Sequence, residues 1–197
     1  MQINQIKVFG ERHSGNNYLM QLLLANFDKK YFPKGWVKDY GWTHGLAKKT
    51  DDEKTLFILI YRNPVSWALA MHKNPHSDQR PNPLFRKFIR SSFEDYYNPI
   101  LMRTYKLREN INTLKRCPTF LVSYESLLSD AEKGLNLMTN LFSLSRSDNF
   151  QDIKMEAMPN GTIHPNKMYS KRHYNLSGFY MDYMSKEDAI FIEEMSK

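Results

Sequence analysis

The chain has 197 residues, of which 41% are hydrophobic, 14% aromatic and 25% charged, a composition typical of one globular domain, which we expect to span residues 1–197. No run is apolar enough to cross a bilayer and no secretory leader opens the sequence, so we expect a cytoplasmic protein without a membrane partner. The net charge of +7 favours an anionic partner, and the single Cys117, which we interpret as a buried thiol, excludes an internal disulfide.

The first predicted element is a strand at residues 5–10 (QIKVFG). A polar turn follows it, and apolar residues then recur at helical spacing from Tyr18 to Phe27. Ser14 or Asn16 is available to cap this helix. The N-terminal part of the chain therefore predicts a strand, a polar turn and a helix in succession.

The second predicted strand, residues 55–61 (TLFILIY), is apolar throughout, as a strand buried on both faces is. It ends at Arg-Asn-Pro, where Pro64 suits the first turn of a helix. Residues 72–83 are rich in proline and polar residues and predict a mobile loop or lid. Residues 85–115 predict helix, with a break at Asn98-Pro99.

The third predicted strand, residues 119–124 (TFLVSY), leads into one amphipathic helical pattern over residues 125–144. Residues 185–197 predict a closing helix with a Ser185-x-x-Asp188 cap. Strands that alternate with helices predict an α/β protein in three layers, with a central parallel sheet and helices on both faces.

The turn after the first strand has the composition of an anion-binding loop. A glycine at a helix N-terminus lets backbone N–H groups approach a phosphate, and polar and basic neighbours can add hydrogen bonds and charge. The candidate residues are Arg12, His13, Ser14, Gly15, Asn16 and Asn17. The Gly-Lys-Ser/Thr of nucleotide kinases is missing, and a surface turn capped by polar residues remains an alternative.

Four segments, in this order, resemble the sulfotransferases that use 3′-phosphoadenosine 5′-phosphosulfate (PAPS). RHSGNNYL resembles the loop that binds the 5′-phosphosulfate in that family, and YGWTHGL is similar to the segment that supplies the catalytic base. FILIYRNPVSWALAMH is similar to the strand and helix that hold the 3′-phosphate, and FLVSYESLLSDAEKGLNLMTNLFSL resembles the Tyr-Glu-Asp/Ser-Leu segment. The resemblance implies a P-loop-like nucleotide-binding topology and PAPS as co-substrate, with no metal required.

The resemblance also implies a role for individual residues. His44 would be the general base, and Arg12 or His13 would neutralise charge on the leaving phosphate. Arg62 would bind the 3′-phosphate, and Tyr124 would lie near the nucleotide. The remaining residues implied to bind the nucleotide are Ser14, Gly15, Asn16, Asn17, Ser66, Lys171 and Arg172.

Two positions depart from the family pattern. His13 stands where the family carries lysine or arginine, so Arg12 is the expected substitute, with an Arg12–Glu11 ion pair as the alternative for that side chain. Ala70 stands where the family carries a serine on the 3′-phosphate, and Ser66 could donate in its place. These departures leave open a protein that binds the nucleotide without turnover.

The acceptor is not specified by these motifs. We expect a small molecule or a glycan that offers a hydroxyl or an amine, and we do not expect nucleic acid as the partner. A P-loop-type nucleotide or sugar kinase and a non-catalytic polyanion- or RNA-binding module remain as alternatives, because both fit part of the pattern.

Overall fold

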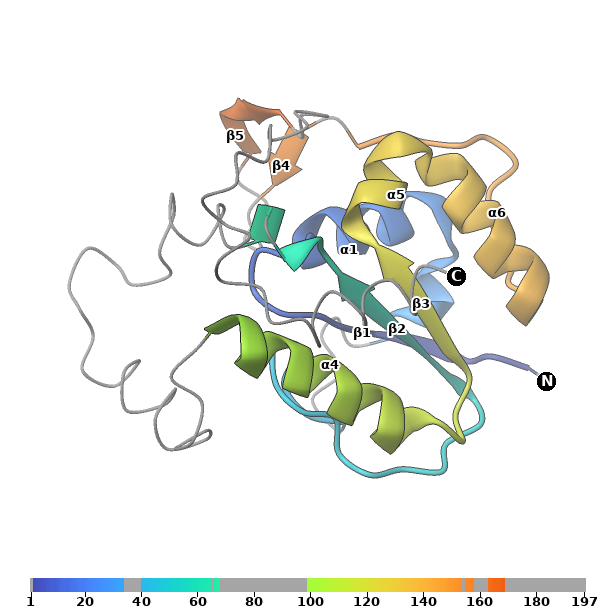
Figure 1. Ribbon diagram of the computed structural model, residues 1–197. Helices are drawn as coiled ribbons and strands as arrows, with labels where there is room; N and C mark the ends of the chain where they lie inside the picture. Colours follow the sequence, from blue (N-terminus) through green and yellow to red (C-terminus); the bar gives the residue numbers. More distant parts are fainter. Residues whose placement is uncertain are drawn as a thin grey trace.

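The computed structural model describes residues 2–33, 40–64, 66–67, 99–153, 155–157 and 163–168. Its helices and strands in chain order are β1 (Gln5–Phe9), α1 (Asn16–Asn26), the 3-10 turn η1 (Lys29–Tyr31), β2 (Thr55–Tyr61), α4 (Pro99–Leu114), β3 (Thr119–Ser123), α5 (Tyr124–Ser129), α6 (Ala131–Phe142), β4 (Met155–Ala157) and β5 (Ile163–Met168) (Figure 1). No helix in these ranges combines the length and the apolar character that spanning a bilayer would need.

The central sheet is parallel and has the order β1-β2-β3. In the register of its ladders Val8 lies opposite Ile58, and Leu59 lies opposite Leu121. Because the strands are parallel, the segments that follow β1, β2 and β3 all leave from the same edge of the sheet. That edge gathers residues that lie far apart in the sequence.

Helices cover both faces of this sheet, with α4 on one face and α1, α5 and α6 on the other (Figure 1). Side chains alternate along β2, so Ile58 and Ile60 belong to the core under α1, α5 and α6, whereas Phe57 and Leu59 belong to the core that α4 closes with Leu114. This arrangement confirms the predicted three-layer α/β fold. The succession of β1, a glycine-containing loop and α1 gives it a P-loop-like topology.

Two local predictions were wrong. The N-cap of α1 is Gly15, and no side chain caps this helix, although Ser14 and Asn16 were both available. The amphipathic pattern over residues 125–144 forms two helices, because Asp130 leaves the helical conformation and its side chain accepts a hydrogen bond from the backbone N–H of Lys133. Asp130 thereby ends α5 and caps α6.

The remaining predictions concern α4, the pair β4 and β5, and segments outside the described residues. α4 is described from Pro99 onward, and the predicted break at Asn98-Pro99 stays a prediction because residues 68–98 lie outside the described residues. β4 and β5 form an antiparallel pair that the sequence analysis did not predict. The predicted lid at residues 72–83, the closing helix at residues 185–197, and Ala70, Lys171 and Arg172 lie outside the described residues.

Candidate functional site

The loop between β1 and α1 carries two left-handed backbone conformations, at His13 with φ 62° and at Gly15 with φ 92°. A Cβ atom at Gly15 would lie 2.2 Å from the ring of Tyr124, at the start of α5. A side chain at this position would therefore suffer both backbone strain and a clash. The glycine lets the loop pass directly against the tyrosine.

Asn16 closes this loop on itself. Its side chain is buried, and its Nδ2 donates to the carbonyl of Gly10 at 2.8 Å and to that of Glu11 at 3.0 Å. The Asn16 amide therefore holds the loop, and the predicted phosphate donors at this point are the backbone N–H groups of the first turn of α1. No side chain caps that turn and it contains no acidic residue, so it suits an anion.

Arg62 connects the end of β2 to the loop. Its Nε donates to Ser66 Oγ at 2.9 Å, and its Nη1 donates to the carbonyl of His13 at 3.0 Å. The guanidinium carbon lies 5.0 Å from the centre of the Tyr124 ring, a cation–π arrangement. Arg62, Ser66, Tyr124 and the loop thus meet at the edge of the sheet, although they come from three separate segments.

Glu125 organises this edge. Its Oε1 accepts hydrogen bonds from Ser66 Oγ at 2.8 Å and from the backbone N–H of Asn63 at 3.0 Å. Because Ser66 Oγ donates to this carboxylate, the hydroxyl would have to turn away from it to donate to a ligand.

Arg12 lies on the outer side of the loop. Its guanidinium carbon is 5.2 Å from the centre of the exposed Trp42 ring, and its carbonyl accepts a hydrogen bond from Trp67 Nε1 at 2.6 Å. The Glu11 carboxylate, considered above as a partner for Arg12, forms an ion pair with Lys106 at 2.7 Å. Its other oxygen accepts the backbone N–H of Arg12 at 3.0 Å.

His44 lies against the start of the loop, with its Nδ1 2.8 Å from the carbonyl of Gly10 and 3.2 Å from Asn16 Nδ2. The two N–H bonds of Asn16 Nδ2 are directed at backbone carbonyls, so Nδ1 must be the donor to the Gly10 carbonyl. The neutral imidazole then carries its proton on Nδ1 and its lone pair on Nε2. This tautomer is the one in which Nε2 can accept a proton.

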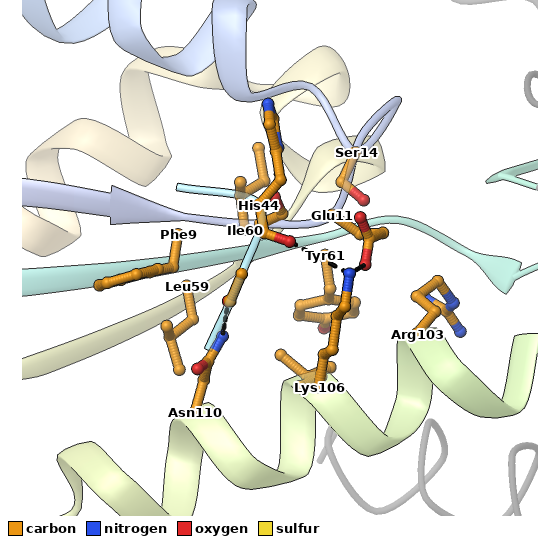
Figure 2. Close-up of a pocket in the computed structure, with 13 residues that line it drawn as sticks. Phe9, Glu11, Ser14, His44, Leu59, Ile60, Tyr61, Arg103, Lys106 and Asn110 are labelled. Atoms are coloured by element: carbon orange, nitrogen blue, oxygen red, sulfur yellow. Dashed lines mark hydrogen bonds and ion pairs between the residues drawn. The ribbon is translucent and has the colours of Figure 1, made fainter. Parts of the chain in front are cut away.

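A pocket opens between the loop and α4 (Figure 2). Polar side chains in its lining are Glu11, Ser14, His44, Arg103, Lys106 and Asn110, and the floor includes Phe9, Leu59 and Ile60. The sequence analysis missed Glu11 as a pocket residue and missed the three polar residues from α4. The only signal was spacing, since Arg103, Lys106 and Asn110 recur on one face of a helix in which they are buried.

Arg103 adds a buried side chain beside the partly exposed Arg62. Its Nη1 donates to the carbonyl of Arg62 at 2.9 Å, and the group lies 5.7 Å from the centre of the Trp67 ring. Positive side chains from both β2 and α4 therefore converge on the end of the loop. Such a concentration of positive charge favours an anionic ligand.

Two titratable groups near the cores have shifted pKa values. Burial, reinforced by Asp152, raises the pKa of Tyr18 to about 12, and the ring packs edge-on against Tyr124. Burial also raises the pKa of the Cys117 thiol, which donates to the carbonyl of Thr50. The interpretation of Cys117 as a buried thiol is confirmed.

No cluster of three or more histidine, cysteine, aspartate or glutamate side chains suited to a metal ion occurs among the residues that the structure describes. The part of the site that can be described is instead built from backbone N–H groups, the guanidinium groups of Arg12, Arg62 and Arg103, and the imidazoles of His13 and His44. These groups can bind an anion and transfer a proton.

No protein-family model matches the chain, and no curated protein matches it. Among solved structures, the chain is similar to a crystal structure of mouse sulfotransferase SULT7A1 complexed with PAP, with 16% sequence identity and a TM-score of 0.48. The alignment covers 97% of this chain and 81% of that one. At this level of similarity, the function has to be inferred from the residues of the site.

Proposed function

We propose that this protein transfers a sulfuryl group from PAPS to a hydroxyl or an amine of a small-molecule or glycan acceptor, with His44 as the general base. The S–O bond to the leaving phosphate breaks, and a bond forms between sulfur and the acceptor atom. The acceptor proton passes to Nε2 of His44, and 3′-phosphoadenosine 5′-phosphate (PAP) is released. The proposal includes no metal ion.

In this proposal the loop and the N-terminus of α1 hold the 5′-phosphosulfate. The first turn of α1 has no side-chain cap and no acidic residue, which fits an anionic group at that point. Arg12 and His13 are the proposed groups for the charge that develops on the leaving phosphate. Ser14, Gly15, Asn16 and Asn17 complete the loop around it.

The 3′-phosphate is assigned to Arg62 and Ser66, with the nucleotide beside Tyr124. One observation carries the proposal: Arg62 contacts the loop at the His13 carbonyl, the Ser66 hydroxyl and the Tyr124 ring at the same time. An arginine in that position can bind a phosphate through two parallel hydrogen bonds next to a second anion site on the loop. Lys171 and Arg172 remain proposed contacts to the same phosphate.

The experiment is a calorimetric titration of the protein with PAP in the absence of Mg²⁺, beside the same titration with adenosine 5′-phosphate. We expect micromolar binding that prefers PAP, and we expect Arg62→Lys to lose at least about tenfold in affinity, because lysine cannot make the paired hydrogen bonds. Arg116→Ala is the matched control: it removes an exposed arginine before β3, at the opposite edge of the sheet. Its affinity should equal that of the wild type.

Three results would contradict the proposal. Equal affinity for PAP and adenosine 5′-phosphate would remove the assigned role of Arg62. Binding of ATP that requires Mg²⁺ would favour the kinase alternative. Binding of oligonucleotides in preference to PAP, with a steep dependence on salt, would favour the polyanion-binding module.

A further inference from the structure

We propose that Lys106 is a positioning residue for His44: its ammonium group, held by Glu11, fixes the main chain that carries the imidazole. The inference deepens the proposed function, on which it rests for the role of His44 as the base. The claim about the imidazole itself concerns the free protein and can be measured without any ligand.

Lys106 joins the loop to the His44 segment through two hydrogen bonds. Its Nζ donates to Glu11 Oε2 at 2.7 Å and to the carbonyl oxygen of His44 at 3.1 Å. Only 11% of the lysine side chain and 10% of the glutamate side chain are exposed. A pair this well shielded from water is strongly held, because either charge left alone would be buried without a partner.

Asn110, one turn further along α4, holds the next part of the same segment. Its Oδ1 accepts the backbone N–H of Ala47 at 2.7 Å, and its Nδ2 donates to the carbonyl of Gly45 at 3.2 Å. Figure 2 shows Lys106 and Asn110 extending from α4 toward this main chain, while the imidazole of His44 points away from the helix. α4 therefore acts on the backbone of the segment and not on the ring.

The loop after β1 holds the other side of the segment. The backbone N–H of Gly10 donates to the carbonyl of Thr43 at 3.0 Å, and the Gly10 carbonyl accepts from His44 Nδ1. Residues 43–47 belong to no helix or strand, so they have no regular backbone ladder to fix them. Their position depends on the bonds from Gly10 on one side and from Lys106 and Asn110 on the other.

It follows that the tautomer of His44 depends on Lys106. The Nδ1–H form requires the ring to stay within hydrogen-bond distance of the Gly10 carbonyl, which in turn requires the backbone of His44 to stay where Lys106 holds it. Loss of that support should let the ring leave Gly10, and the imidazole would then populate both neutral tautomers.

The test is an NMR measurement of the ¹⁵N shifts of His44 in the unliganded protein at a pH where the ring is neutral. We expect wild type and Lys106→Arg to show a protonated Nδ1 and an unprotonated Nε2. The Glu11→Gln/Lys106→Met double variant removes both members of the pair, so no buried charge is left unpaired, and we expect mixed tautomers in it. Arg108→Met, which removes an exposed charge from the same helix, should give the wild-type spectrum.

A kinetic comparison completes the test once an acceptor is known. The double variant should lose at least about tenfold in kcat, with its KM for PAPS within about twofold of the wild-type value. A wild-type tautomer in the double variant would overturn the proposal. If the double variant also bound PAP more weakly while keeping that tautomer, Lys106 would be a ligand contact instead of a positioning residue. If the double variant shows mixed tautomers and the wild-type protein does not bind PAP, the proposed function is refuted and the positioning role of Lys106 remains.

Discussion

Gly15 is the residue at which the loop and α5 come closest. Replacement by alanine adds a Cβ atom 2.2 Å from the Tyr124 ring and imposes φ 92° on a residue with a side chain. We expect Gly15→Ala to lower the free energy of unfolding by at least about 2 kcal/mol, because strain and clash add. Urea denaturation followed by circular dichroism measures this loss.

Two further variants separate the causes of that loss. A Tyr124→Ala background removes the ring, so only the backbone strain of Gly15→Ala remains. In that background Gly15→Ala should lower the free energy of unfolding by about 1 kcal/mol. Gly45→Ala is the matched control, since its Cβ would approach no atom closer than 3.4 Å. An equal loss for Gly15→Ala with and without the tyrosine would show that the ring is not the obstacle.

Among single residues, the sequence analysis selected side chains that stand in a characteristic motif and missed functional side chains that do not. Arg62 follows a buried strand and precedes proline, and His44 stands in Thr-His-Gly, so both could be selected. Lys106 stands in a helical stretch with no characteristic motif around it. Its function as a partner of Glu11 depends on a contact across 95 positions of sequence, which no local pattern encodes.

Among the elements, β2 begins at a network centred on Asp52. Its carboxylate accepts hydrogen bonds from the Tyr40 hydroxyl, from Thr55 Oγ1 at 2.7 Å and from the backbone N–H of Lys54 at 2.7 Å. Burial alone would raise the pKa of Asp52, but the bonds from Tyr40 and Thr55 outweigh that effect and lower the pKa below its usual value.

A carboxyl group with a lowered pKa stabilises the folded state above the ordinary carboxyl pKa, and this contribution is lost as the pH falls through the lowered value. We therefore expect Asp52→Asn to cost about 1 kcal/mol at neutral pH. The difference from wild type should shrink as the pH falls below the ordinary carboxyl pKa, because the unfolded wild-type chain binds the proton first. Urea melts of both proteins at several pH values measure this, and a difference that does not change with pH would contradict the assigned cause.

The elements also show how far local pattern can predict structure. The bounds predicted for β2 are confirmed, because every residue from Thr55 to Tyr61 fits a buried strand. The division between α5 and α6 was missed, since the apolar spacing continues across Asp130 and only its cap reveals the break. β4 and β5 were missed because a short antiparallel pair has a weak sequence signal.

For the whole molecule, the two cores share β2 as a common wall. Ile58 packs into one core and its neighbour Phe57 into the other, and both are fully buried. We expect Ile58→Ala to cost about 2–5 kcal/mol and Phe57→Ala about 3–5 kcal/mol. If the chain is one domain, each variant should keep a single transition in which tryptophan fluorescence and circular dichroism coincide. Two separate transitions in either variant would show that the cores unfold independently.

The distance in sequence between Glu11 and Lys106 sets an order of events during synthesis. β1, the loop and the His44 segment leave the ribosome well before α4. The Lys106 hydrogen bonds to Glu11 and to the carbonyl of His44 nevertheless come from α4. A nascent chain that has produced only the first two strands can have formed the loop and its bonds from Gly10 to the His44 segment, but it lacks the hydrogen bonds that Lys106 and Asn110 supply. The proposed anion-binding loop is therefore synthesised early, and the contacts proposed to position His44 are completed late.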